Sequence, residues 1–353
     1  MKKLSHRRRI TYSLILVFCM TFLFSGCSKN NESGSNGNSD TAEVQTTPIS
    51  KSAFKLNTIV FIALYDSTDE SIIDEALELC DYYENLLSRT IATSEISKIN
   101  ESALIPVTVS EDTYGLLEKG LYYSRLSNGA FDITVEPLTS LWNFSSSSPK
   151  VPPASDIELA VSEIDYEKVL LENRTVTLEK EGMGIDLGAI AKGYVADKIK
   201  EFLLSKGVNS AMINLGGNVL CVGEKPDGSA FKVGIQKPFE NRNETIAVME
   251  LTDKSVVSSG IYERYFVEDG ISYHHILNPS TGYPYNTDLV SVTIISDHST
   301  DGDGLSTVCF ALGLEKGLEL INSLEDTYAV FITSDYELHY SEGFKENIPT
   351  IEQ

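Results

Sequence analysis

The chain has 353 residues, with 28 lysines and arginines against 51 aspartates and glutamates, which gives a formal net charge of −23. So large an excess of acid excludes binding to nucleic acid or anionic lipid through bulk electrostatics, and a polyanionic ligand would need a local positive group. Hydrophobic residues make up 42% of the chain, enough for one large domain or two closely packed lobes.

Residues 1–26 have the pattern of a signal peptide. A basic stretch precedes an apolar run over 10–24 that is too short for a transmembrane helix, and Ser25-Gly26 then lead to Cys27. Small residues before a cysteine at this point resemble the lipobox of bacterial lipoproteins. We therefore predict an extracytoplasmic protein anchored to the cell membrane by a lipidated Cys27 that carries palmitate. An ordinary secretory signal with an incidental Cys27 is the alternative.

Residues 27–53 are rich in serine, asparagine, glycine and threonine and predict a flexible tether that follows the lipidated cysteine. Residues 54–353 are then predicted to form a single folded body. Its cysteines, Cys80, Cys221 and Cys309, are odd in number and lie in apolar runs, so we expect buried thiols and no disulfide framework.

Periodicity and turn signals predict short helices and strands along this body. A strand over 56–65 precedes helices over 67–87 and 111–126, and residues 144–156 form a loop. After a helix over 190–205 come strands at 210–215, 219–223, 232–236, 245–251, 265–267, 272–277 and 289–296, a helix over 304–312, a helix up to 324 and a hairpin over 328–340. Segregated helices and mostly antiparallel strands indicate an α+β fold and not a doubly wound sheet.

Residues 184–194 join a strand-like run to a helix start. Backbone N–H groups and the positive dipole end of a helix, together with close approach at glycine, can bind a phosphorylated ligand. Lys192 would face the phosphate, and Asp186 could bind a sugar or a metal ion. An ordinary strand-to-helix turn is the alternative. Gly182 and Gly184 begin like the dinucleotide fingerprint G-x-G-x-x-G. The next glycine is Gly188, one position too late, so that fingerprint is excluded.

Two further acids occupy candidate positions. Asp303 and Thr307 are four residues apart, so on a helix a carboxylate and a hydroxyl would share one face and could bind a hard cation such as Mg²⁺. The alternative is that Asp303 caps a helix over 305–312. Asp132 is an acid in a tight apolar loop and is a second candidate. The alternative is that Asp132 caps a connection from a helix to a strand.

His274 and His275 lie together before a turn rich in proline and glycine, in a chain with five histidines. Adjacent residues of a strand face opposite ways, so at most one of the pair points into a site. The supply of cysteine and histidine is poor for a zinc site. A general base or a ligand contact is the functional interpretation, and a satisfied strand histidine is the alternative.

Five segments in one order resemble the ApbE family of flavin transferases. They are Gly-Ala-Phe-Asp-Ile-Thr at 129–134, Asp-Leu-Gly-Ala-Ile-Ala-Lys-Gly-Tyr at 186–194, Asn-Leu-Gly-Gly-Asn at 214–218, His-Ile-Leu-Asn-Pro-Ser-Thr-Gly-Tyr-Pro at 275–284 and Asp-x-x-x-Thr at 303–307. Ser88-Arg89 and residues 94–100 are similar to an early segment of the family. The resemblance runs from about residue 54 to the C-terminus.

The resemblance implies a T-fold-like body and a Mg²⁺-dependent enzyme that splits FAD, attaches FMN to a Ser or Thr of an extracytoplasmic flavoprotein and releases AMP. An FAD pyrophosphatase and a non-catalytic flavin-binding lipoprotein are the alternatives. Three positions depart from the family pattern and leave the balance between transfer and hydrolysis open: Asn278 for Asp, Thr90 for an aromatic residue and Asn57 for Gly.

Site residues follow from the same resemblance by position. The expected metal ligands are the Ala189 carbonyl, Asp303 and Thr307. We expect Asp303 and His275 to be catalytic, with His275 placing or deprotonating the attacking hydroxyl. The expected FAD contacts are Leu56, Thr90, Ala130, Phe131, Asp132, Asp186, Lys192 and His275.

Overall fold

The computed structural model describes residues 47–240 and 244–351, which belong to one compact unit, Gln45–Gln353. The predicted signal peptide, Cys27 and most of the predicted tether lie outside the described residues. Within the described part of the chain, no helix has the length and apolar character needed to span a membrane.

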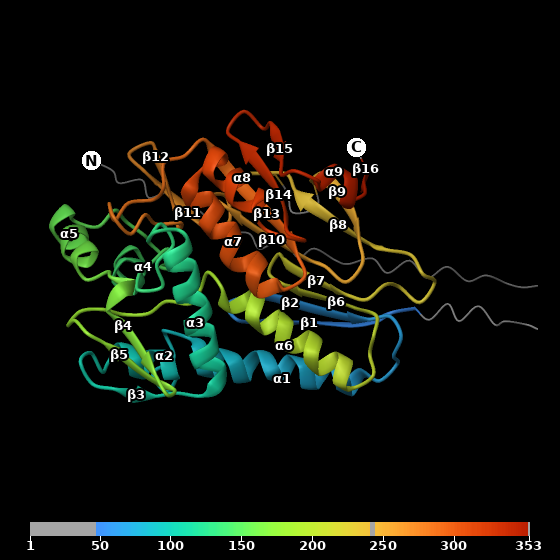
Figure 1. The fold of residues 1–353 in the computed structure, drawn as a ribbon, viewed down its shortest axis with the longest axis horizontal. Coiled ribbons are helices and arrows are strands. Elements are labelled where there is room, and N and C mark those ends of the chain that lie inside the picture. Colours follow the sequence, from blue (N-terminus) through green and yellow to red (C-terminus); the bar gives the residue numbers. More distant parts are fainter. Residues whose placement is uncertain (1–46, 241–243, 352–353) are drawn as a thin grey trace, which may run out of the picture. The chain divides into compact units, whose positions relative to one another are not determined.

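An eight-stranded sheet forms the centre of the body, and all its neighbouring strands are antiparallel (Figure 1). In spatial order the strands are β1 (Ile49–Lys55), β2 (Thr58–Leu64), β6 (Ala211–Leu215), β7 (Asn218–Val222), β10 (Ser255–Gly260), β13 (Leu289–Ser296), β14 (Tyr328–Thr333) and β15 (Leu338–Tyr340). Side chains alternate between its faces, so Val292 and Ile294 of β13 join one apolar cluster and Ile295 joins another.

Helices pack on one face of this sheet, and a three-stranded sheet packs on the other. Figure 1 shows α1 (Glu70–Leu87) and α6 (Ala191–Ser205) running along β1, β2, β6 and β7, while α7 (Ser299–Leu312) covers β10 and β13 and α8 (Leu314–Asn322) covers β14. The second sheet has the order β16 (Thr350–Ile351), β9 (Thr245–Leu251), β8 (Phe231–Gln236). Both faces of the central strands are thereby buried, and every residue of β13 is buried.

A smaller helical region precedes α6 in the chain. It contains α2 (Glu95–Asn100), α3 (Glu111–Leu126), α4 (Glu136–Trp142), α5 (Ala154–Ser162), a 3₁₀ turn (Tyr166–Lys168) and the sheet β3 (Val107–Thr108), β5 (Thr175–Leu178), β4 (Val169–Glu172). The hairpin β11 (Tyr265–Glu268) and β12 (Ile271–His274) packs against it through aromatic contacts of Trp142. The last helix is α9 (Phe344–Asn347).

The predicted fold class, α+β with mostly antiparallel strands, is confirmed. The helix predicted over 111–126 is α3, and the helix predicted over 190–205 is α6. Several boundaries are wrong, and the strand predicted over 272–277 ends at His274. α5 begins at Ala154, inside the predicted loop over 144–156, and α7 begins at Ser299 and not at residue 304.

β1 begins at Ile49, five residues before the predicted boundary between tether and body at residue 54. β1 pairs with β2 along its whole length, from Ile49 opposite Leu64 to Lys55 opposite Thr58. Lys51 and Lys55 of β1 form ion pairs with acidic side chains of α1. The outward-facing serines of β1 gave this edge strand the composition of a linker.

Candidate active site

The candidate site forms where the start of α6 meets the first turns of α7. The backbone N–H of Gly193 in α6 donates to Asp303 Oδ2 in α7 at 2.8 Å. A Cβ at position 193 would lie 2.2 Å from the Ser299 carbonyl oxygen and 2.8 Å from Asp303 Cβ. Only glycine therefore allows the two helices to approach this closely.

The contact between the two helices is reciprocal, because Asp197 of α6 caps α7. Its carboxylate accepts from the backbone N–H groups of Ser299 at 2.8 Å and Thr300 at 2.9 Å, and from the Thr300 hydroxyl at 2.6 Å. This cap explains why α7 begins at Ser299. Asp303 is consequently inside α7, one turn before Thr307, so the alternative in which Asp303 caps a helix over 305–312 is wrong.

The bond between Gly193 and Asp303 also changes the start of α6. In a regular helix the N–H of residue 193 donates to the carbonyl of residue 189. Tyr194 N–H does donate to the Ile190 carbonyl at 3.1 Å, whereas Gly193 N–H is committed to Asp303. Among the described residues, no hydrogen-bond donor reaches the Ala189 carbonyl, which therefore keeps its lone pairs available.

The oxygens of the Ala189 carbonyl, the Asp303 carboxylate and the Thr307 hydroxyl suit a hard cation. A backbone carbonyl, a carboxylate and a hydroxyl are the ligand types that Mg²⁺ accepts, and Mg²⁺ usually keeps waters or substrate phosphates for its remaining positions. Over residues 47–240 and 244–351, no group of three or more His, Cys, Asp or Glu side chains could hold a metal ion. A metal in this part of the chain would therefore depend on a mixed oxygen set such as Ala189, Asp303 and Thr307.

Asp303 and Lys192 form a charge pair at the centre of the site. Lys192 Nζ lies 3.4 Å from Asp303 Oδ1, and the Asp303 side chain is 5% exposed while that of Lys192 is 33% exposed. Burial raises the pKa of the Asp303 carboxyl, and the Lys192 ammonium and the Gly193 N–H oppose that rise. Lys192 therefore keeps a partly exposed cationic end beside a buried carboxylate.

Asp186 is held by its own loop and by an arginine. Its carboxylate accepts from the Gly188 N–H at 2.8 Å and the Thr139 hydroxyl at 2.7 Å, and it pairs with Arg89 Nε at 2.8 Å. Arg89 was not among the predicted site residues, although it lies in the early segment that resembles the family. The pairing brings the loop after α1, which carries Thr90, to the 184–194 junction.

Hydrogen bonds within the 129–134 loop, and from Tyr166 and Tyr285 outside it, hold the loop in place. Asp132 Oδ1 accepts from the N–H and the hydroxyl of Thr134, at 2.8 and 2.6 Å, and Oδ2 accepts from Tyr166 N–H at 3.3 Å. Burial raises the pKa of Asp132 to about 6, against the effect of these hydrogen bonds. Phe131 is buried, and the Ala130 carbonyl accepts from the Tyr285 hydroxyl at 2.8 Å. The Asp132 side chain therefore holds the connection between α3 and α4, whereas the alternative considered for it expected a connection from a helix to a strand.

The two histidines have different surroundings. His274 Nε2 is 2.8 Å from the Tyr285 carbonyl and its Nδ1 accepts from Ile276 N–H at 3.3 Å, so both ring nitrogens serve the fold. His275 Nδ1 is 3.3 Å from the Arg264 carbonyl. Because a carbonyl only accepts, Nδ1 carries the proton and Nε2 is the basic nitrogen. Of the pair, His275 is the one that keeps a nitrogen for a ligand.

The turn that follows His275 is clamped by the helical region. Trp142 Nε1 of α4 donates to the Gly282 carbonyl at 2.8 Å. Gly282 has a φ of 75°, and a Cβ there would lie 2.3 Å from Ile157 Cγ2.

Leu56 is at the β1–β2 turn with a φ of 52°, and its N–H donates to Glu84 Oε2 at 3.1 Å.

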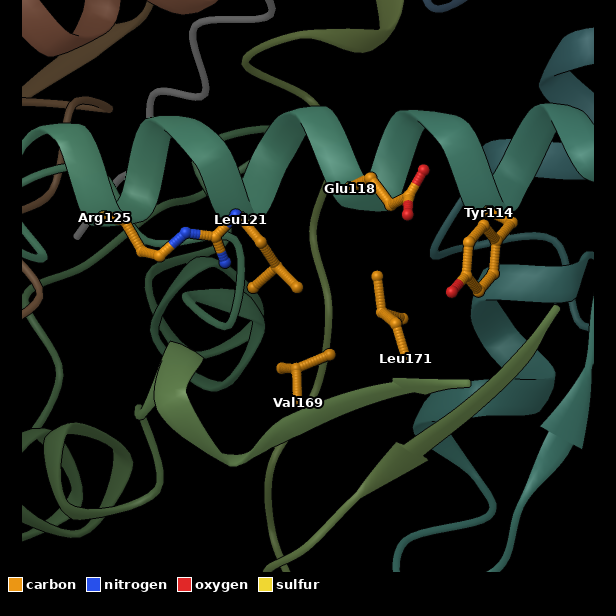
Figure 2. A pocket seen from close by; sticks show the side chains of 6 residues that line it. All are labelled: Tyr114, Glu118, Leu121, Arg125, Val169 and Leu171. Carbon is orange, nitrogen blue, oxygen red and sulfur yellow. The ribbon is translucent and has the colours of Figure 1, made fainter. Parts of the chain in front are cut away.

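A surface hollow of about 310 Å³ lies away from these residues. Figure 2 shows it between α3, which contributes four of the labelled side chains, and β4, which contributes Val169 and Leu171. None of the predicted site residues lines this hollow (Tyr114, Glu118, Leu121, Arg125, Val169 and Leu171). The geometry at the α6–α7 contact, and not the presence of a cavity, therefore identifies the candidate site.

Comparison with known proteins agrees with this fold. The ApbE family model matches residues 56–332, so the chain belongs to the ApbE family. The FAD:protein FMN transferase of Klebsiella pneumoniae (strain 342) is 39% identical over 292 residues, which cover 82% of this chain and 90% of that protein. The protein of the same name from Treponema pallidum (strain Nichols) is 34% identical over 323 residues, 86% of this chain and 89% of that protein.

A solved structure shows the same architecture. The crystal structure of the ApbE protein from Thermotoga maritima superposes with a TM-score of 0.79 at 33% identity, and the match covers 85% of this chain and 99% of that one. The family predicted from five ordered motifs is thus confirmed, as is the fold that the motifs implied.

Proposed function

We propose that this chain transfers FMN from FAD to a Ser or Thr hydroxyl of another extracytoplasmic protein, requires Mg²⁺ and releases AMP. The observation that carries the proposal is the α6–α7 contact, where Asp303 accepts from the Gly193 N–H and pairs with Lys192, while no donor among the described residues reaches the Ala189 carbonyl. The relatives named FAD:protein FMN transferase, which align with most of the chain, support the same activity.

The Ala189 carbonyl, Asp303 and Thr307 would hold the Mg²⁺ ion. Bound there, Mg²⁺ would supply Lewis-acid stabilisation of the charge on the pyrophosphate. Lys192 binds a phosphate oxygen, which gives a chain of net charge −23 the local positive group that a polyanion requires. Leu56, Thr90, Ala130, Phe131, Asp132 and Asp186 remain the proposed surroundings of FAD.

The reaction is a displacement at phosphorus. The acceptor hydroxyl oxygen forms a bond to the phosphorus of the FMN half, the bond from that phosphorus to the bridging oxygen breaks, and AMP leaves. His275 Nε2 receives the hydroxyl proton. Burial, Arg264 and His274 lower the pKa of His275 to about 3, so the ring is neutral at pH 7 and able to accept. The negative charge of a bound pyrophosphate would raise that pKa and strengthen the base.

The location proposed for this activity is the outer side of the cell membrane, with lipidated Cys27 as the anchor. The support is the sequence of residues 1–27 alone. An extracytoplasmic acceptor then follows, because the enzyme and its protein substrate must share a compartment.

The decisive experiment incubates the full chain, solubilised in detergent, with FAD, Mg²⁺ and fragments of candidate extracytoplasmic acceptors. We expect a flavin-fluorescent acceptor band, a mass gain of FMN less water on a Ser or Thr, and one AMP for each label. FMN and AMP without a label would instead indicate a pyrophosphatase. FAD binding without cleavage would indicate a non-catalytic flavin-binding lipoprotein. The experiment must distinguish transfer from hydrolysis, because the chain departs from the family pattern at Asn278, Thr90 and Asn57.

A further inference from the structure

A chain of three hydroxyl groups connects β10 to the candidate metal ligands of α7. Ser259 Oγ of β10 is 3.1 Å from Thr307 Oγ1 and 2.8 Å from Ser306 Oγ. Ser306 Oγ in turn donates to the Asp303 carbonyl at 2.9 Å. The chain therefore begins at one proposed Mg²⁺ ligand, Thr307, and ends on the backbone of another, Asp303.

The direction of this chain is fixed by its end. A carbonyl oxygen only accepts, and each hydroxyl has a single proton to donate. Ser306 uses its proton on the Asp303 carbonyl, so the bond between Ser259 and Ser306 requires Ser259 as the donor. The Ser259 oxygen is then left as the acceptor of the Thr307 proton. The Thr307 hydroxyl consequently points its hydrogen at Ser259 and its lone pairs away from it.

We infer that Ser259 is a positioning residue, which holds the Thr307 hydroxyl with its lone pairs directed to the Mg²⁺ site. The inference rests on the metal assignment in the proposed function. A hydroxyl that turned its hydrogen toward the metal would repel the cation. Mg²⁺ also tolerates little deviation from octahedral geometry, so a fixed direction of each ligand contributes to affinity. Groups that orient metal ligands from behind act in the same way in other metal sites.

The neighbouring serine provides a matched control. Ser258 is adjacent to Ser259 in β10, and adjacent strand residues face opposite sides of the sheet. Its hydroxyl is 2.7 Å from that of Thr293 in β13, on the side away from Thr307. Like Ser259→Ala, Ser258→Ala removes a half-buried strand hydroxyl. It breaks one hydroxyl–hydroxyl bond, to Thr293, where Ser259→Ala breaks two, and it leaves the chain to Thr307 intact.

The test measures Mn²⁺ affinity of the full chain in detergent by electron paramagnetic resonance, with Mn²⁺ as the probe because it accepts the same oxygen ligands. For Ser259→Ala we expect about 10-fold weaker binding, the low end of the effect of outer-shell changes. Ser258→Ala should bind as the wild type does, and Ser259→Thr, which keeps the hydroxyl, should restore most of the affinity. The Mg²⁺ concentration for half-maximal FAD cleavage should rise in Ser259→Ala, with kcat at saturating Mg²⁺ little changed.

Unchanged Mn²⁺ affinity in Ser259→Ala, or an equal loss in Ser258→Ala, would overturn the inference. If circular dichroism shows that Ser259→Ala is unfolded, Ser306→Ala decides, because it frees Ser259 to donate to Thr307 and should also weaken Mn²⁺ binding. A wild type that binds no Mn²⁺ removes the metal assignment and this inference together. Mn²⁺ binding with the expected order, but no labelled acceptor, removes only the proposed transfer.

Discussion

Asp303 joins the structural and the chemical demands on the candidate site. Its carboxylate accepts the Gly193 N–H, pairs with Lys192 and is 3% exposed as a residue. A buried carboxylate is costly unless its oxygens are paired. Here one carboxylate oxygen accepts from the Gly193 N–H at the start of α6. The other oxygen faces the Lys192 ammonium, which we propose binds the phosphate. The same contact that holds the two helices together leaves the Ala189 carbonyl unpaired.

Changing Asp303 to Ala should abolish FAD cleavage. It removes the charged ligand of the proposed metal, so we expect a loss of more than about 100-fold in rate, larger than an outer-shell change causes. The assay is AMP release from FAD at saturating Mg²⁺. Asp301→Asn is the control, since Asp301 lies in the same helix but pairs with Lys119. Activity that survives Asp303→Ala would refute the metal assignment.

His275 should make stability depend on pH. Its pKa is lowered to about 3 in the folded chain, by burial first and then by Arg264, His274 and Lys192, whereas the ordinary value is 6.5. As the pH falls below 6.5 the unfolded chain binds a proton that the folded ring refuses. The contribution is therefore complete above pH 6.5 and is lost progressively toward pH 3.

We expect His275→Gln to lose less stability than the wild type between pH 7 and pH 5, by about 1 kcal/mol after allowance for partial solvent exposure of the ring. Urea unfolding at the two pH values measures the difference. The comparison cancels the opposite contribution of Asp132, whose raised pKa favours the folded chain on acidification. Equal losses in both proteins would show that His275 titrates normally.

At the scale of elements, α6 and α7 hold each other through their termini. Asp197 of α6 accepts from the first two backbone N–H groups of α7, and Asp303 of α7 accepts from the Gly193 N–H of α6. Each helix start thus lies against a carboxylate of the other, where the helix dipole favours negative charge. The motifs in the sequence indicated a phosphate at the start of α6, but they did not indicate the Asp303 carboxylate that lies there.

Replacing Gly193 by Ala should separate the two helices. A methyl group 2.2 Å from the Ser299 carbonyl oxygen cannot be accommodated without a backbone shift. We expect a loss of about 2–3 kcal/mol in the free energy of unfolding, as for overpacked cores, together with weaker Mn²⁺ binding. Gly115→Ala in α3 is the control: no atom lies within 4 Å of its Cβ, and it should stabilise the chain by about 0.5–1 kcal/mol. Urea unfolding of both variants decides, and an unchanged Gly193→Ala would contradict the helix contact.

At the scale of the whole molecule, β1 closes one edge of the central sheet. It covers β2 along seven residue pairs and fixes α1 through Lys51 and Lys55. Without β1, β2 would become an exposed edge with unpaired backbone groups. The folded body therefore depends on residues that the composition assigned to the tether.

Two truncations should separate these alternatives. A chain that begins at Ile49 keeps β1 and should melt at the temperature of the longer protein. A chain that begins at Phe54 loses most of β1 and the Lys51 ion pair, and we expect about 1–3 kcal/mol less stability, the range of a strongly destabilising single change. Thermal melts followed by circular dichroism measure both. Equal melting temperatures would show that β1 adds nothing to the body.

The sequence by itself determined the features that depend on local chemistry. The bounds of α3 were predictable because Ser110 caps it and apolar residues recur at helical spacing. The family followed from five short motifs in one order, and Asp303, Thr307 and Lys192 from their places in those motifs. The net charge of −23 excluded binding to nucleic acid or anionic lipid through bulk electrostatics, without any knowledge of the fold.

Only the tertiary structure decided how those motifs meet. Gly193 and Asp303, which are hydrogen-bonded, are 110 residues apart in the chain. Arg89, which follows the C-terminus of α1, pairs with Asp186. Ser259 contacts Thr307 from the separate strand β10. β1 became recognisable only opposite β2 and α1. Such contacts depend on the packing of distant segments, and composition and periodicity describe only near neighbours. The unpaired Ala189 carbonyl and the direction of the Thr307 hydroxyl exist only in the folded chain.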